Sequence, residues 1–274
     1  MALTDALGCK HQAFEGAPRI VSLVPSLTEL ICDLGLADCL VGRTGFCVHP
    51  REILRRIPKV GGTKDIKLDI IQSLAPTHVI ADIDENRREP VEAMMAFVPH
   101  VVVVHPRAVD DNLALYDLLG GIFCRENEVV RLASAFVEAR GALAAVTATL
   151  PRETVLYPIW REPWMTIRRD TYIASMLSAG GWDTLPAEAS VRYPGFAFAE
   201  PWLADIQRIL LPSEPYAFGD RDAVELHTLT QRPVIRVDGE MLSWYGSRAI
   251  AGLNYLAELR EQCAEADRQA SPPA

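Results

Sequence analysis

A cysteine and a histidine two positions apart, Cys47 and His49, are the first candidates for chemistry in this chain. They follow Phe46, after a short strand predicted over residues 40–42. In extended backbone, side chains at i and i+2 point to the same side. Both can ligate soft or borderline metals, and the imidazole is a candidate axial ligand of a bound metal. Two ligands do not complete a tetrahedral zinc site, so a buried thiol beside a loop histidine is the alternative.

Two tryptophans and a methionine form the sharpest local feature of the second half. Trp160, Trp164 and Met165 follow a strand predicted over residues 154–159, and Tyr172 comes soon after at the start of a predicted helix. Aromatic faces cover large flat ligands well and cost little rotamer entropy. A surface for a flat macrocycle is therefore predicted here, and an aromatic cluster in the core is the alternative.

Further aromatic and basic residues follow two later strands. Tyr216 comes after a strand predicted over residues 209–212, and Trp244, Tyr245 and Arg248 lie between the last strand and the last helix. Because ligands of open α/β sheets bind outside the carboxyl ends of the strands, we expect these residues to line one cleft with Trp160. The alternative for the last group is a capped helix with packed aromatic residues.

The first half offers polar and glycine-containing turns. Pro25 and Ser26 follow a strand over residues 19–24, where helix amides can hold an anionic or amide oxygen. Ser26 with Glu29 also fits a capping box, which predicts Ser26 as the helix N-cap. Gly62 and Thr63 lie in a turn that lets backbone approach a ligand. The spacing of that turn is not a P-loop.

Strands that alternate with helices predict an α/β fold with central parallel sheets. A helix predicted over residues 126–150 is long enough to join two Rossmann-like lobes as a connecting backbone helix. The predicted organisation is an N-terminal extension (1–18), an N-terminal α/β lobe (19–125), the connecting helix (126–150), a C-terminal α/β lobe (151–263) and a flexible tail (264–274).

The composition of the chain argues against some classes of partner and favours a location. The chain has 274 residues, 49% of them hydrophobic, and a net charge of −9, which argues against nucleic acid as a partner. No apolar run is long enough for a transmembrane helix, so no membrane insertion is expected. No secretory signal is recognisable, and the six cysteines form no C-x-x-C pair. A cytoplasmic protein with reduced thiols is therefore predicted, or a periplasmic one if the true start lies upstream.

Four stretches in this order, residues 19–29, 60–64, 68–81 and 211–216, make the chain resemble the class III (helical-backbone) periplasmic binding proteins. These are receptors for cobalamin, haem and ferric siderophores, and the cobalamin-binding branch looks closest. The resemblance covers about residues 18–262. It implies two α/β lobes, a backbone helix and an ABC permease partner. By position, the acidic residues that would dock the permease are Glu85 or Glu89 and Glu200.

We therefore expect a ligand-binding protein that holds a corrinoid or related metal chelate in the cleft between its lobes, with no nucleotide cofactor. A direct metal-ion binding protein that uses Cys47 and His49 is the alternative, followed by a cysteine-dependent enzyme. Catalysis is less well supported, because the sequence has no G-x-S-x-G, H-E-x-x-H or G-x-G-x-x-G motif, and nothing indicates a third group to orient a Cys47–His49 pair.

Overall fold

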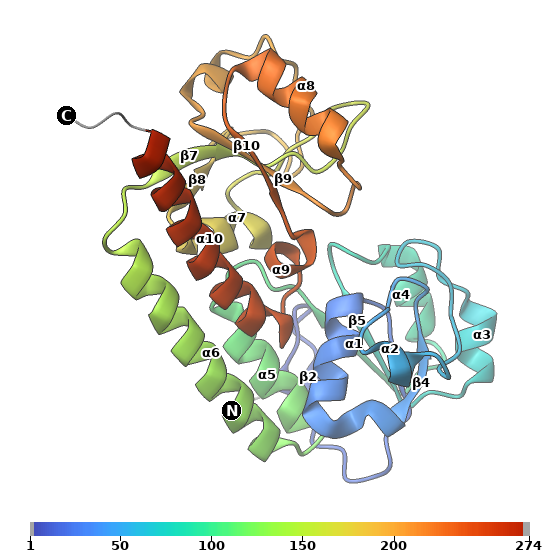
Figure 1. Cartoon of the computed structure of the whole chain (residues 1–274). Helices are drawn as coiled ribbons and strands as arrows, with labels where there is room; N and C mark the ends of the chain where they lie inside the picture. The colour runs from blue at the N-terminus through green and yellow to red at the C-terminus, as the bar shows by residue number, and fades with distance from the viewer. Residues whose placement is uncertain (1–2, 271–274) are drawn as a thin grey trace. The chain divides into compact units, whose positions relative to one another are not determined.

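The computed structural model describes residues 3–270 (Figure 1). The chain divides into two compact units. Unit 1 comprises Met1–Pro106, Asp110–Ala135 and Tyr245–Arg248, and unit 2 comprises Arg107–Val109, Phe136–Trp244 and Ala249–Ala274. The division falls inside helix α6 (Glu126–Thr147), which occupies most of the range predicted for the connecting helix.

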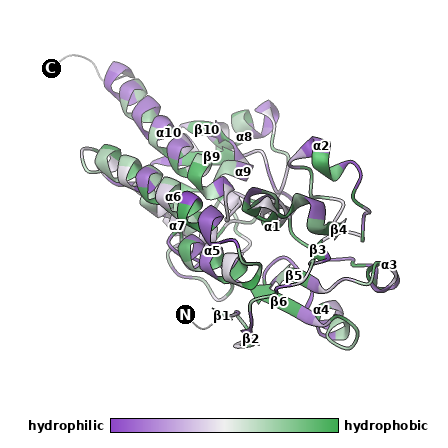
Figure 2. Cartoon of the chain, turned by 90° about the horizontal axis from the view of Figure 1, so that it is seen from below, coloured by the Kyte–Doolittle hydropathy of each residue, from purple (hydrophilic) through white to green (hydrophobic). Residues whose placement is uncertain are grey.

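Unit 1 is built on a four-stranded parallel sheet in the order β4-β3-β5-β6. The strands are β3 (Ile20–Ser22), β4 (Leu40–Arg43), β5 (His78–Asp82) and β6 (His100–Val104). Most of their residues are buried, and β6 is coloured as hydrophobic in Figure 2. Strands this apolar are expected where a parallel sheet is covered on both faces.

Five α-helices lie wholly within the described part of unit 1: α1 (Pro25–Ile31), α2 (Arg51–Leu54), α3 (Leu68–Ser73), α4 (Arg88–Met94) and α5 (Asp111–Ile122). A π-helix η1 (Cys32–Leu36) and a 3₁₀ turn η2 (Ala37–Cys39) follow α1. The predicted capping box at Ser26 is wrong. Val24 is the N-cap of α1, and Pro25 occupies the first turn, where its missing N–H costs nothing. The Glu29 carboxylate instead pairs with Arg248, with an Nη2–Oε1 distance of 2.7 Å.

The N-terminal segment, predicted as an extension without secondary structure, contains two short strands. β1 (Leu3–Thr4) and β2 (Lys10–His11) form an antiparallel pair. The Ala6 amide donates to the Val103 carbonyl at 2.8 Å, and the Val103 amide donates to the Asp5 carboxylate at 3.1 Å. Asp5 and Ala6 are therefore held against strand β6 by hydrogen bonds. A pattern of alternating apolar residues does not predict such bonds.

Unit 2 repeats the parallel architecture in the order β10-β9-β7-β8. Its strands are β7 (Glu153–Leu156), β8 (Trp182–Thr184), β9 (Arg208–Pro212) and β10 (Val234–Val237). The helical elements are α7 (Tyr172–Ala179), a 3₁₀ turn η3 (Pro201–Asp205), α8 (Asp220–Thr230), α9 (Gly239–Ser243) and α10 (Arg248–Ala270). The prediction of two parallel-sheet α/β lobes is confirmed.

Helix α10 extends beyond its predicted end. Residues 264–270, expected to belong to a flexible tail, continue the helix. Cys263 is buried and the Asp267 carboxylate accepts a hydrogen bond from Arg208 at 2.6 Å, so this turn has tertiary contacts. Residues 271–274 lie outside the described part of the chain. No helix in that part is long and apolar enough to cross a membrane.

A buried ion cluster links α10 to the sheet of unit 2. The Glu153 carboxylate accepts hydrogen bonds from Arg260 at 2.7 Å and from Arg208 at 2.9 Å. Burial alone would raise the pKa of Glu153, but the bonds from Arg260 and Arg208 outweigh it and hold that pKa below its usual value. The Arg260 guanidinium is 1% exposed and also lies over the Trp182 ring at 4.7 Å.

We expect Arg260→Met to lower the free energy of unfolding by about 2–4 kcal/mol, because removal of one partner leaves a buried carboxylate only partly compensated. Arg152→Met is the matched control. Arg152 pairs with Asp183 in the same unit, but its side chain is 52% exposed, and such surface pairs contribute less than about 1 kcal/mol. Urea unfolding of both variants measures the difference, and equal losses would contradict the importance of the buried cluster.

Candidate ligand-binding site

The strand-end loops of unit 2 carry an exposed aromatic surface. After β7 the chain makes a short turn in which the Met165 amide donates to the Trp160 carbonyl at 3.1 Å, and the Ile159 amide to the Met165 carbonyl at 2.9 Å. This backbone pairing presents the Trp160 ring, which is 45% exposed. The ring meets Tyr216 edge-on, with 5.3 Å between centroids. Trp160 and Tyr216 are thus brought together as predicted.

Behind Trp160 the aromatic contacts continue into the core of unit 2. Tyr216 touches Phe218 at 4.6 Å, and Phe218 stacks parallel on Trp164 at 5.8 Å. The full set, which we name the aromatic cluster, comprises Trp160, Trp164, Phe196, Phe198, Trp202, Tyr216 and Phe218. Sequence reasoning missed Phe196, Phe198, Trp202 and Phe218, although Phe196 and Phe198 alternate as residues in extended chain do.

The cluster is braced by a cation. The Arg161 guanidinium lies over the Trp164 ring at 5.5 Å. It also donates to the carboxylates of Asp222 and Glu225, the latter at 2.7 Å. Both bonds compensate its charge and fix the turn between Trp160 and Trp164. The cluster therefore presents a preorganised apolar face rather than an anion site.

Trp244, Tyr245 and Arg248, predicted to line one cleft with Trp160, are divided between the two units, and that shared cleft stays a prediction. Trp244 is 8% exposed and its indole N–H donates to the Glu214 carboxylate at 2.8 Å in unit 2. Tyr245 is 7% exposed and belongs to unit 1. Consecutive residues thus pack into different units. Arg248 is engaged by Glu29, which accounts for its charge.

Two other predicted contacts in unit 2 are less accessible than expected. Tyr172 is the first residue of α7 and is buried, so it contributes to the core. Met165 is half-buried in its pairing with Trp160. Of the predicted set in this unit, Trp160 alone is exposed, and the half-buried Tyr216 ring supports it.

In unit 1 the predicted residues lie after β3, β4 and in the glycine turn. Ser26 is buried in α1, and Pro25 is half-buried. The Phe46 ring is 63% exposed, and a Cβ on Gly62 would lie 3.3 Å from it, so glycine permits this close approach. The Thr63 carbonyl accepts from Asn86 at 2.9 Å, which ties the glycine turn to the loop after β5.

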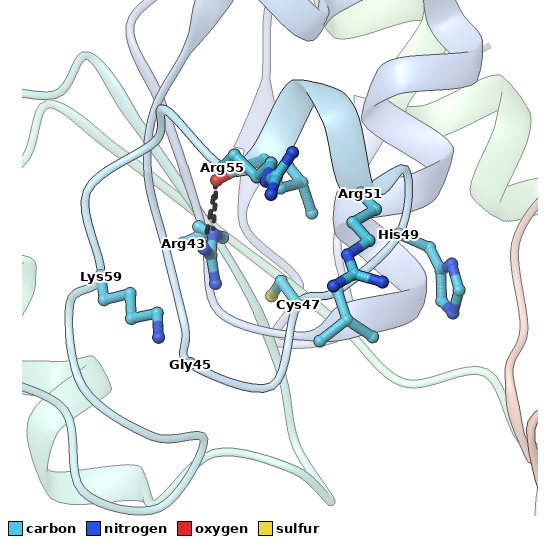
Figure 3. A pocket seen from close by; sticks show the side chains of 9 residues that line it. Arg43, Gly45, Cys47, His49, Arg51, Arg55 and Lys59 are labelled. Atoms are coloured by element: carbon cyan, nitrogen blue, oxygen red, sulfur yellow. Dashed lines mark hydrogen bonds between the residues drawn. The ribbon is translucent and has the colours of Figure 1, made fainter.

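Cys47 and His49 are not assembled as a metal site. Cys47 is fully buried, the Thr28 hydroxyl donates to its sulfur at 3.0 Å and the Thr44 hydroxyl lies 3.1 Å away. Burial raises the pKa of the thiol above its ordinary value, which disfavours the thiolate that metals require. The His49 ring extends away from that sulfur (Figure 3). Among residues 3–270 no group of three or more His, Cys, Asp or Glu is placed to hold a metal.

A buried carboxyl that the sequence did not single out lies at the end of β5. Asp82 is 3% exposed, and its Oδ1 accepts from the amides of Asp84 at 2.7 Å and Glu85 at 3.0 Å. Burial, together with the charges of Glu85 and Asp84, raises its pKa to about 7 despite those bonds. Burial and then the charges of Asp82 and Glu85 also raise the pKa of Tyr245. The strand-end edge of unit 1 thus holds a carboxyl that titrates near neutrality.

The three acidic residues that the resemblance implies for docking are all accessible. Glu85 and Glu89 lie in the loop after β5 and the first turn of α4, and Glu200 precedes η3. All three are exposed. Their role stays a prediction.

The raised pKa of Asp82 leads us to expect that the free energy of unfolding depends on pH. The folded chain holds this proton at pH values where the unfolded chain has lost it, so the free energy of unfolding falls as pH rises from about 4 to about 7. Asp82→Asn should remove that part of the slope, on the order of 1–4 kcal/mol at 1.4 kcal/mol per pKa unit, because its amide oxygen still accepts the two N–H groups. Urea unfolding at acidic and alkaline pH tests this. Exposed Asp65→Asn is the control, and an unchanged slope in Asp82→Asn would refute the shifted pKa.

Comparison with known proteins places this geometry in a family. Residues 20–201 match the family described as periplasmic binding protein. A vitamin B12-binding protein of Pectobacterium atrosepticum is 24% identical over 94% of this chain and 95% of its own length.

Solved structures agree on the fold. The periplasmic vitamin B12-binding protein of Vibrio cholerae has a TM-score of 0.78 at 19% identity, covering 90% of this chain and 98% of its own. The apo periplasmic haem-binding protein of Roseiflexus sp. RS-1 has a TM-score of 0.77 at 23% identity, covering 91% and 100%. The resemblance read from the sequence is confirmed. The chain belongs to the periplasmic binding protein family and is a ligand-binding protein rather than an enzyme.

Proposed function

We propose that this protein binds a corrinoid of the cobalamin type, and that Trp160 on the aromatic cluster covers a face or edge of the macrocycle. One observation carries the proposal. A large indole ring stays 45% exposed at the carboxyl ends of the unit 2 strands, supported from behind by Tyr216. An apolar ring held rigidly at a strand-end edge is typical of a ligand contact.

Physical chemistry favours a flat, weakly charged partner for this surface. Trp160 and Tyr216 present ring faces and edges, and the nearby Arg161 is compensated by Asp222 and Glu225. Burial of an aromatic side chain against such a partner gains free energy roughly in proportion to the apolar area removed from water, about 25 cal/mol per Å². A macrocycle supplies a large area of this kind.

Relatives support the same ligand class. One sequence relative and one structural neighbour are named for vitamin B12, and another neighbour is named for haem. Both ligands are metal-holding macrocycles. Cobalamin is the ligand we favour because it is the one named for the sequence relative that matches over most of the chain, and haem is the alternative.

Delivery to an ABC permease is part of the proposal. Exposed Glu85 or Glu89 in unit 1 and Glu200 in unit 2 would supply the acidic docking contacts. Such delivery goes with the periplasmic location, which was the alternative in the sequence analysis. The cytoplasmic location, which would leave these acidic residues without that role, and the placement of the ligand between the two units stay predictions.

We expect Trp160→Ala to weaken cyanocobalamin binding by about tenfold or more, equivalent to 1.4 kcal/mol or more, because aromatic anchors dominate such interfaces. Trp160→Phe should restore most of the affinity. Calorimetric titration of the wild type and both variants measures the effect. Leu229→Ala, which removes an equally exposed apolar side chain on α8, is the control and should bind as the wild type does.

A parallel titration with hemin separates the two macrocycles. Preference for cyanocobalamin supports the proposal. If hemin binds more tightly and its binding is lost in Trp160→Ala, the surface is the binding site but its ligand is haem. If neither affinity changes in Trp160→Ala, this surface is not the binding site.

Axial ligation by His49 is tested separately. If the His49 imidazole binds cobalt, His49→Ala should shift the visible spectrum of bound hydroxocobalamin, because the axial ligand changes. A spectrum identical to that of the wild-type complex would show that His49 does not ligate the metal.

A further inference from the structure

The loop that follows β4 borders an open pocket lined with positive charge. The pocket has a volume of about 520 Å³, and Arg43, Arg51, Arg55 and Lys59 line it, all within unit 1. Figure 3 shows these four side chains around the opening formed by the loop. We name this feature the basic pocket. Its charge is opposite to that of the chain, which carries a net −9.

Arg43 is the buried member of the basic pocket. It is 7% exposed, and its guanidinium donates to the Leu54 carbonyl from Nε and Nη2 and to the Thr44 carbonyl from Nη1, at 3.0–3.2 Å. A guanidinium has five N–H donors, so two are left uncommitted. No carboxylate among the described residues forms an ion pair with it. A buried charge without a counter-charge is costly.

The positive charges of the exposed members of the basic pocket are also poorly compensated. Arg51 and Lys59 form no ion pair with any described carboxylate. Arg55 approaches Glu52 at 3.6 Å, but the two side chains are 67% and 83% exposed, so that contact contributes little. Four positive charges thus gather around the pocket, and among the described residues the exposed Glu52 is the one carboxylate that forms an ion pair with any of them. Their mutual repulsion costs free energy that a bound anion would recover.

We propose that the basic pocket binds a small oxyanion with two or more negative charges, with phosphate as the reference ligand. The planar fork of Arg43 suits two oxygens of a phosphoryl or carboxylate group, and Arg51 and Lys59 supply charge at the mouth. The volume lies within the usual range for small-molecule sites. The residues of this anion site all belong to unit 1, and the aromatic cluster belongs to unit 2.

The test uses the full chain and contains no corrinoid, so its outcome is independent of the proposed function. Inorganic phosphate, pyrophosphate and citrate are titrated into the protein at low ionic strength and followed by calorimetry. We expect saturable binding that weakens as sodium chloride is raised, because salt screens exposed charge. The Arg51→Gln/Lys59→Gln double variant should lose about tenfold or more in affinity. Both substitutions are on exposed side chains and should leave folding intact.

Arg56→Gln is the matched control. Arg56 lies in the same segment and is equally exposed, but it does not line the cavity, so its loss should change affinity by less than about twofold. Arg43→Lys keeps the charge but removes the fork, and it should weaken phosphate binding as well. Absence of saturable heat with all three anions in the wild type would overturn the proposal. An equal loss of affinity in Arg56→Gln would also overturn it, because that result would indicate only a general attraction between the anion and surface charge.

Discussion

Parallel strand pairing is the constraint on which the rest of this protein depends. Both four-stranded sheets are entirely parallel, so each sheet collects the loops after all of its strands along a single edge. The residues between strands can then vary in chemistry while the strands remain apolar. Trp160 and Tyr216 follow neighbouring strands β7 and β9, Phe46 follows β4, and Asp82 is the last residue of β5. Residues far apart in sequence meet at an edge because the strands before them pair in register.

Rigidity at these edges comes from charge compensation close to the surface. In unit 2, Arg161 connects the turn that carries Trp160 to the carboxylates of Asp222 and Glu225, and it lies over Trp164. Deeper in the same unit, Arg260 and Arg208 compensate Glu153. An exposed aromatic ring held in this way loses little conformational entropy when a ligand arrives. Unit 1 differs, because the buried Arg43 has carbonyl partners and, within residues 3–270, forms no ion pair with a carboxylate.

The parallel sheets, the long helix and the position of the strand-end loops could be predicted from the sequence, because each depends on local periodicity and turn residues. The pairing of Trp160 with Tyr216 followed from the same rule. The packing of Trp244 and Tyr245 into different units could not be predicted. The two residues are adjacent in the sequence, and nothing there indicates that the Glu214 carboxylate accepts a hydrogen bond from the Trp244 indole. Likewise, Ser26 and Glu29 match a capping box by spacing, but Pro25 displaces the cap and Arg248, distant in sequence, binds Glu29. The raised pKa of Asp82 depends on burial, which sequence alone does not reveal.

A preformed aromatic face should allow this chain to bind a corrinoid without rearrangement. Native mass spectrometry of the purified chain mixed with cyanocobalamin measures that binding. We expect an intact complex of one cyanocobalamin per chain that survives transfer to the gas phase. A spectrum that contains only the free chain, at ligand concentrations well above micromolar, would contradict it.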